Sequence, residues 1–89
     1  MKAILTVIGR DQVGIIAAVC TLLSEKNVNV MDISQTIMQG YFTMMMATDV
    51  SASTVPMAQL AAELDRLGKE MGLSIRIQRR DLFTAMHRI

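Results

Sequence analysis

The hydrophobic residues of this 89-residue chain change their spacing in the same way twice. On each side of the dipeptide Gln39-Gly40, apolar runs that repeat every second residue flank a run that repeats at helical spacing. Gln39-Gly40 itself is typical of a tight turn between antiparallel strands. The predicted order of elements is therefore strand, helix, strand, strand, helix, strand.

The first half of the chain begins with a strand and a helix joined by a short loop. Residues 2–8 alternate between two faces, as a strand does. Residues 13–26 carry apolar side chains at helical spacing and end in a polar segment. We expect Asp11 to be the N-cap of this helix, contributing about 1 kcal/mol, and Asn27 to end it in the left-handed conformation.

Residues 28–38 and 41–50 form the predicted hairpin. Polar side chains interrupt the first run, and its phase slips near Asp32, which indicates a bulged or edge strand. The second run continues as a strand whose larger apolar side chains share one face. These side chains are Phe42, Met44, Met46 and Val50.

A second helix and a last strand follow the hairpin. Pro56 fits the first turn of the helix, and Gly72 is expected to end it. Gly68 lies inside the apolar stripe and is expected to weaken the helix slightly. Residues 73–78 alternate between apolar and polar side chains, as a half-buried strand does. The stripe consists of Leu60, Ala61, Leu64, Leu67 and Met71.

This order predicts an α+β protein with the ferredoxin-like βαββαβ fold. Two right-handed crossovers give a four-stranded antiparallel sheet with both helices on one face. The open face then carries Ile4, Ile8 and Arg76. We expect residues 1–80 to form one domain and residues 81–89 to form a C-terminal tail. The tail is interpreted as a short docking helix with one apolar face, made of Leu82, Phe83, Met86 and Ile89.

Composition narrows the range of partners. A formal net charge of +1 provides no broad field for nucleic acid or an anionic membrane, so neither is expected as a partner. The N-terminus shows no cleavable signal or membrane-length run, and the single Cys20 cannot form an internal disulfide, which together favour the cytoplasm. Hydrophobic residues make up 52% of the chain, so part of the apolar surface is expected to face a partner.

Residues that usually carry catalysis are sparse. Cys20 lies on the apolar stripe of the first helix and is interpreted as a small core residue, with a nucleophile as the minor alternative. His87 is the only histidine, which argues against a Ser-His-Asp arrangement and against a metal site. We therefore expect no enzymatic activity, no cofactor and no metal.

The loop after the first strand is the strongest functional feature. It combines two glycines, an acidic residue and backbone amides that precede a helix. Its amides favour a ligand carboxylate, and Asp11 favours an ammonium group. The alternatives are that Asp11 only caps the helix and that Gly14 only permits close packing of helix on strand. The candidate contacts are Gly9, Asp11, Gln12, Val13, Gly14 and Ile15.

Two segments, GRDQVGII at residues 9–16 and NVNVMDI at residues 27–33, resemble the ACT domain, and the likeness covers about residues 2–80. The chain looks most like a small stand-alone ACT protein. It is also similar to the modules of the glycine-cleavage regulator and of the formyltetrahydrofolate hydrolase. The family's usual proline before the glycine is Val13 here, which makes the loop less pre-organised.

The resemblance implies a regulatory module that forms a homodimer by side-by-side sheet pairing and binds an amino acid or related metabolite at the seam. By position it assigns Asp11 and Gly14 of one subunit to the ligand site, with Asn29 supplied by the other subunit. An edge strand also tolerates Asn29 without any binding role. The alternative function is a ligand-independent adaptor that binds a regulated protein.

Overall fold

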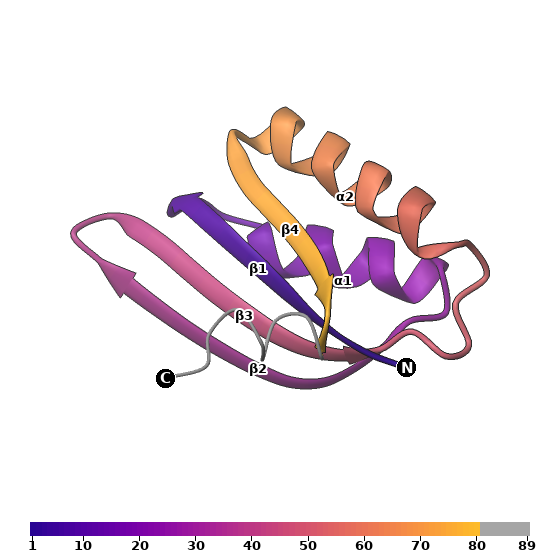
Figure 1. Ribbon diagram of the computed structural model, residues 1–89. Coiled ribbons are helices and arrows are strands. Elements are labelled where there is room, and N and C mark those ends of the chain that lie inside the picture. Colours follow the sequence, from indigo (N-terminus) through magenta and orange to yellow (C-terminus); the bar gives the residue numbers. More distant parts are fainter. Residues whose placement is uncertain (81–89) are drawn as a thin grey trace.

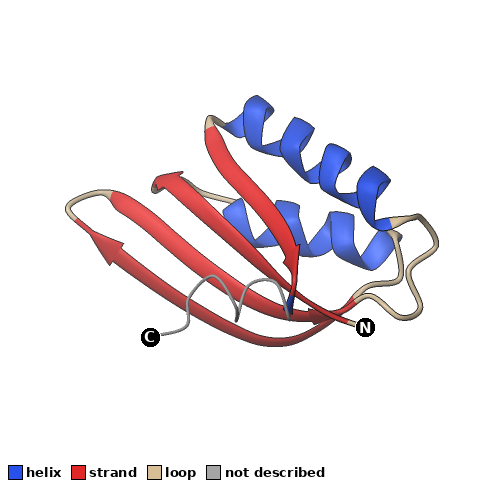
Figure 2. Ribbon diagram, viewed as in Figure 1, coloured by secondary structure: helices blue, strands red, loops and turns tan. Residues whose placement is uncertain are grey.

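The computed structural model describes residues 1–80, which form one antiparallel sheet with two helices on one of its faces (Figure 1). The sheet order is β2-β3-β1-β4, so the predicted ferredoxin-like fold is confirmed (Figure 2). The tail predicted at residues 81–89 lies outside the described residues. The strands are β1 (Lys2–Arg10), β2 (Asn29–Met38), β3 (Tyr41–Asp49) and β4 (Leu73–Arg79), and the helices are α1 (Ile15–Glu25) and α2 (Met57–Met71).

The core lies between the sheet and the two helices. Met44 and Met46 are fully buried, whereas Met45 is 37% exposed on the opposite face, so β3 alternates as predicted. Thioethers thus fill volume in the middle of the sheet. The other large apolar side chains that are fully buried are Leu5, Val7, Val19, Leu23, Leu60 and Leu64.

The hairpin and its bulge follow the sequence prediction. Gln39 and Gly40 have φ of 52° and 82°, the double positive φ of a type I′ turn. The register between β2 and β3 shifts between Val30 and Asp32, which is the predicted bulge. β2 lies at the edge of the sheet, and every residue from 31 to 38 is exposed.

Some ends of the helices and strands are predicted correctly from the sequence and others are not. Asn27 and Gly72 end the helices with φ of 59° and 71°, as expected. The start of α1 is wrong by two residues, since the helix begins at Ile15. Pro56 is the N-cap of α2 rather than a residue of its first turn. Val50 is buried but lies just beyond the end of β3.

Two glycines permit close packing of β4. Gly9 belongs to β1 rather than to the loop, and a Cβ on it would lie 2.4 Å from Leu73 Cδ2. Gly68 faces the same strand, and a Cβ there would lie 2.6 Å from the Leu73 carbonyl oxygen. The description of Gly68 as a weak point of the helix is therefore incomplete, because any side chain would push β4 away from α2.

Candidate functional site

The loop between β1 and α1 is held by hydrogen bonds to distant parts of the chain. The backbone N–H of Asp11 donates to the Gly40 carbonyl oxygen at 2.9 Å. The side-chain Nε2 of Gln12 donates to the Met71 carbonyl oxygen at 2.8 Å. The loop is thereby tied to the hairpin turn and to the C-terminal end of α2. The sequence gives no local signal for either bond.

The expectation that Asp11 caps α1 is wrong. Gly14 occupies the N-cap position with φ of 91°, and no side chain caps the helix. The Ala18 N–H donates to the Gly14 carbonyl at 2.9 Å, so the backbone amides of residues 15–17 come before the first intrahelical bond. Asp11 is exposed, and its backbone is fixed to the hairpin turn before the helix begins.

Gly14 is required by its conformation and not by packing. Its φ lies in the left-handed region that favours glycine. A Cβ built on Gly14 meets no atom within 4 Å, which excludes close packing of helix on strand at this position. Open space therefore lies beside the uncapped end of α1.

The loop residues divide into accessible and structural ones. Val13 is fully exposed, and the Asp11 side chain is exposed beside it in sequence. Ile15 is only 3% exposed and packs in the core, so it offers a ligand its backbone N–H alone. Gln12 holds α2, and Gly9 packs against Leu73.

Asn29 lies at the other end of the sheet within one chain. It is the first residue of β2 and pairs with Asp49, which also pairs with Lys2 at the start of β1. The loop follows Arg10 at the far end of β1, eight residues along the strand, or roughly 26 Å away. The structure therefore does not bring Asn29 to the loop of its own chain. Asn29 instead lines a hollow beside α1 with Cys20, Ser24, Asn27, Val28, Val30 and Ala52.

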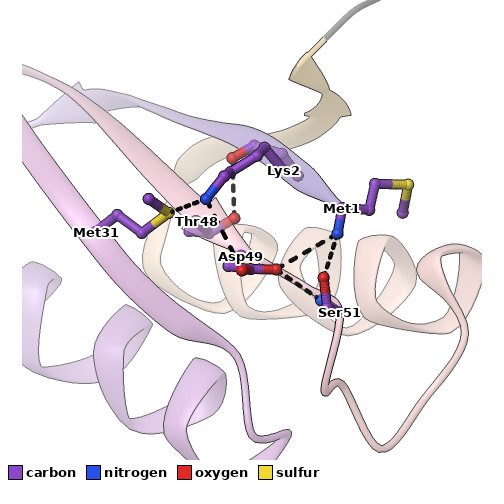
Figure 3. Close-up of polar contacts among 7 residues, drawn as sticks. Met1, Lys2, Met31, Thr48, Asp49 and Ser51 are labelled. Atoms are coloured by element: carbon purple, nitrogen blue, oxygen red, sulfur yellow. Dashed lines mark hydrogen bonds and ion pairs between the residues drawn. The ribbon is translucent and has the colours of Figure 1, made fainter.

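A polar cluster that the sequence analysis does not predict lies close to the start of β1 (Figure 3). The Met1 amine contacts the Ser51 hydroxyl and lies 3.5 Å from Asp49 Oδ1. Lys2 Nζ lies 3.9 Å from Asp49 Oδ2 and 3.2 Å from the Met31 sulfur. Hydrogen bonds from Ser51, first from its hydroxyl and then from its N–H, lower the pKa of Asp49 to about 2. These charges face one another, so the cluster fastens the N-terminus to the end of β3.

The outer edge of the sheet is apolar on the helix side. Ile33 and Ile37 pair in register with the inward-facing Met46 and Phe42, and they remain 39% and 53% exposed. Ile16, 37% exposed, lies one turn before Cys20, which shares the hollow beside β2. We call Ile16, Ile33 and Ile37 the apolar edge.

The described part of the chain contains neither a metal-binding cluster nor a membrane-spanning helix. Within residues 1–80, no three His, Cys, Asp or Glu side chains gather in a group that could hold a metal ion. Neither α1 nor α2 is long and apolar enough to cross a membrane.

A ferredoxin-like sandwich with an open loop before its first helix and an exposed edge strand is the architecture of the ACT domain. The chain belongs to the ACT domain family, whose model matches residues 2–78. It is 55% identical to a UPF0237 protein of Clostridium acetobutylicum over 89 residues, with all of both chains covered. The predicted resemblance is thus confirmed.

Solved structures agree with this assignment. An ACT domain protein from Streptococcus pneumoniae superposes with a TM-score of 0.81 at 38% identity, covering 93% of each chain. A formyltetrahydrofolate deformylase from Pseudomonas syringae shares the fold with a TM-score of 0.80 at 21% identity, over 88% of this chain and 27% of that one. A putative glycine cleavage system transcriptional repressor gives 0.73 at 20% identity, over 86% and 44%.

Proposed function

We propose that this ACT domain is a stand-alone regulatory module, without enzymatic activity, that binds a small amino acid or related metabolite between two subunits. The observation that supports it best is the uncapped start of α1, with open space at Gly14 and the exposed carboxylate of Asp11 nearby. The amides favour a ligand carboxylate, and Asp11 favours an ammonium group. Both groups of an amino acid are then matched.

Side-by-side pairing of two β2 strands is the arrangement proposed for the homodimer. β2 is an exposed edge strand, and the apolar edge lies along it. A two-fold axis makes the paired strands antiparallel, so the start of one β2 lies at the same end of the joined sheet as the finish of the other. Met38 at that finish pairs with Tyr41, and Asp11 bonds the neighbouring Gly40. Asn29 of the partner subunit then lies at the same end as this loop.

A thermal-shift panel of the twenty amino acids, purines and folates tests ligand binding. A ligand at a hundredfold excess over Kd stabilises the folded state by about 2.7 kcal/mol. For a domain of this size that corresponds to a rise in Tm of roughly 4–8 °C for each kcal/mol. Asp11→Asn should reduce the shift, whereas Asp65→Asn, an exposed change on α2, should leave it intact. If no compound raises the Tm at millimolar concentration, the proposal is contradicted.

Light scattering tests the dimer at micromolar concentration. Ile37→Asp places a charge on the apolar edge and is expected to give monomers. Ile8→Asp is the matched control, because Ile8 is 49% exposed on the open face of β1. A wild-type monomer, or equal effects of the two changes, would contradict the shared site.

The second candidate is a ligand-independent adaptor that binds a regulated protein. It is favoured by exposed apolar side chains near the hairpin end of the open face, where Ile8, Met38 and Tyr41 are 49%, 68% and 58% exposed. A partner captured equally well by wild type and by the Asp11→Ala/Asn29→Ala double variant, and lost with Ile8→Asp, would favour this function. In either case we place the protein in the cytoplasm, in keeping with its single cysteine.

A further inference from the structure

The edge strand β2 carries a regular row of backbone groups that no strand pairs (Figure 1). In a β-turn the carbonyl of the first residue accepts from the N–H of the fourth, which makes Met38 and Tyr41 a hydrogen-bonded pair. Bonded and non-bonded pairs alternate along an antiparallel ladder. The backbone N–H and C=O groups of Ile33, Gln35 and Ile37 therefore point away from β3, out of the sheet edge.

The side chains of the same three residues lie on the helix side of the sheet. Ile33, Gln35 and Ile37 are all exposed, because no further strand lies beyond β2. An amide is thus flanked at equal spacing by two isoleucines, so the row is the same in both chain directions. The three residues pair with buried residues of β3, namely Met46, Met44 and Phe42.

We propose that two copies of the chain join their β2 strands about a two-fold axis at Gln35, so that Ile33 of each subunit faces Ile37 of the other. The inference rests on the shared site proposed above and specifies which residues meet there. In this register all three outward-pointing residues find an outward-pointing partner. A shift of two residues would set Ile37 against the bulge at Met31, or Ile33 against the turn at Gln39.

The side chains that meet on the helix side are complementary. Ile33 and Ile37, which are 39% and 53% exposed in the single chain, form two apolar pairs and lose this exposure. Between these pairs, the two copies of Gln35 face each other on the axis. Each amide has both donors and an acceptor, so two copies can satisfy one another.

The side chains that meet on the open face also fit. Ser34 faces Thr36 of the partner subunit, and the two-fold axis repeats this contact. Hydroxyl pairs of this kind form hydrogen bonds across strands. Asp32 is the one charged residue between positions 32 and 38, and it faces the uncharged Met38 of the partner subunit. The register therefore opposes no like charges.

The same register brings Asn29 of the partner subunit to the level of the loop. Counted along β3, Asn29 lies five positions from the axis at Gln35, since the partners of these two residues are Asp49 and Met44. Asp11 bonds Gly40, which lies four positions from Met44 on the other side. Rotation about the axis thus sets Asn29 and Asp11 within one strand residue, or about 3.3 Å, of the same level. Each ligand site is completed by the other subunit.

Disulfide formation between subunits tests the register in the full chain. In a Cys20→Ala background, Ser34→Cys and Thr36→Cys are made singly and together, and each variant is treated with oxidised glutathione. Directly opposite residues of antiparallel strands have Cα atoms about 4.5–5.5 Å apart, which suits a disulfide. Only the double variant places two thiols opposite each other. It should therefore form covalent dimer several-fold faster than either single variant.

The single variants report any other register. Rapid cross-linking of Ser34→Cys alone, or of Thr36→Cys alone, would mean that the strands pair two residues away from this register, and the inference would be wrong although β2 still forms the dimer. Equally slow cross-linking of all three variants, in a protein that light scattering shows to be a dimer, would place the interface elsewhere and overturn the inference as well. A wild-type monomer would contradict the proposed shared site together with the register.

Discussion

Replacing Gly68 by alanine separates the helix propensity of α2 from its packing against β4. Alanine is better than glycine in a helix by about 1 kcal/mol, so propensity alone predicts a gain in stability. In the structure, the new Cβ would lie 2.6 Å from the Leu73 carbonyl oxygen and 3.2 Å from Ile75 Cγ1. The closer obstacle is backbone, so α2 or β4 has to move.

The cost follows from the rigidity of this contact. Overpacking in a core costs about 1–3 kcal/mol. Leu73 and Ile75 are both buried, and a backbone oxygen cannot rotate away as a side chain does, so we take the upper value. After the gain of about 1 kcal/mol in propensity, the net loss for Gly68→Ala is about 2 kcal/mol. That corresponds to a fall in Tm of roughly 8–16 °C for a domain of this size.

Urea unfolding followed by circular dichroism measures this loss directly. Ala62→Gly, at an exposed position of the same helix, is the control and should cost about 1 kcal/mol through propensity alone. The two substitutions are the reverse of each other, yet both should destabilise. A Gly68→Ala variant at least as stable as the wild type would refute the reasoning from packing.

Substitutions at three further positions test a buried hydrogen bond, a surface carboxylate and a backbone conformation. Thr48→Val removes the buried hydrogen bond that Thr48 Oγ1 donates to the Ala3 carbonyl at 2.9 Å and should cost about 1 kcal/mol in urea unfolding. Hydrogen bonds from Ser51 lower the pKa of Asp49 from 3.8 to about 2. The ionised Asp49 therefore stabilises the fold at pH values above 3.8, and this stabilisation is lost as the pH falls towards 2. Asp49→Asn should therefore flatten the acid limb of a stability–pH curve. Gly14→Ala should cost about 1–2 kcal/mol because of its φ of 91°, and Gly14→Asn should cost less in the same assay.

The features that the sequence predicts well are those decided within a few residues. The type I′ turn at Gln39-Gly40, the bulge near Asp32 and the left-handed ends at Asn27 and Gly72 all depend on local backbone preferences. The order of elements then leaves few topologies to choose from. This is why the fold could be inferred from one chain.

The features that the sequence misses depend on partners far along the chain. Gly9 and Gly68 both face Leu73, and no pattern near either glycine reports that contact. The sequence predicts Gln12 as a ligand contact but gives no sign of its bond to Met71, 59 residues away. Glycines and amides are ambiguous in sequence because packing, conformation and binding all select for them.

Two hydrogen bonds that anchor the loop compensate for the absence of a proline at Val13. A proline before the glycine would stiffen the loop by fixing φ, and Val13 lacks that constraint. The bonds from Asp11 to Gly40 and from Gln12 to Met71 supply a constraint of another kind, because they fix the two residues that precede Val13. The loop therefore reaches Gly14 already oriented, and the fully exposed Val13 is left free to face a ligand or a second subunit. Pre-organisation of the candidate site thus comes from tertiary contacts rather than from the loop sequence.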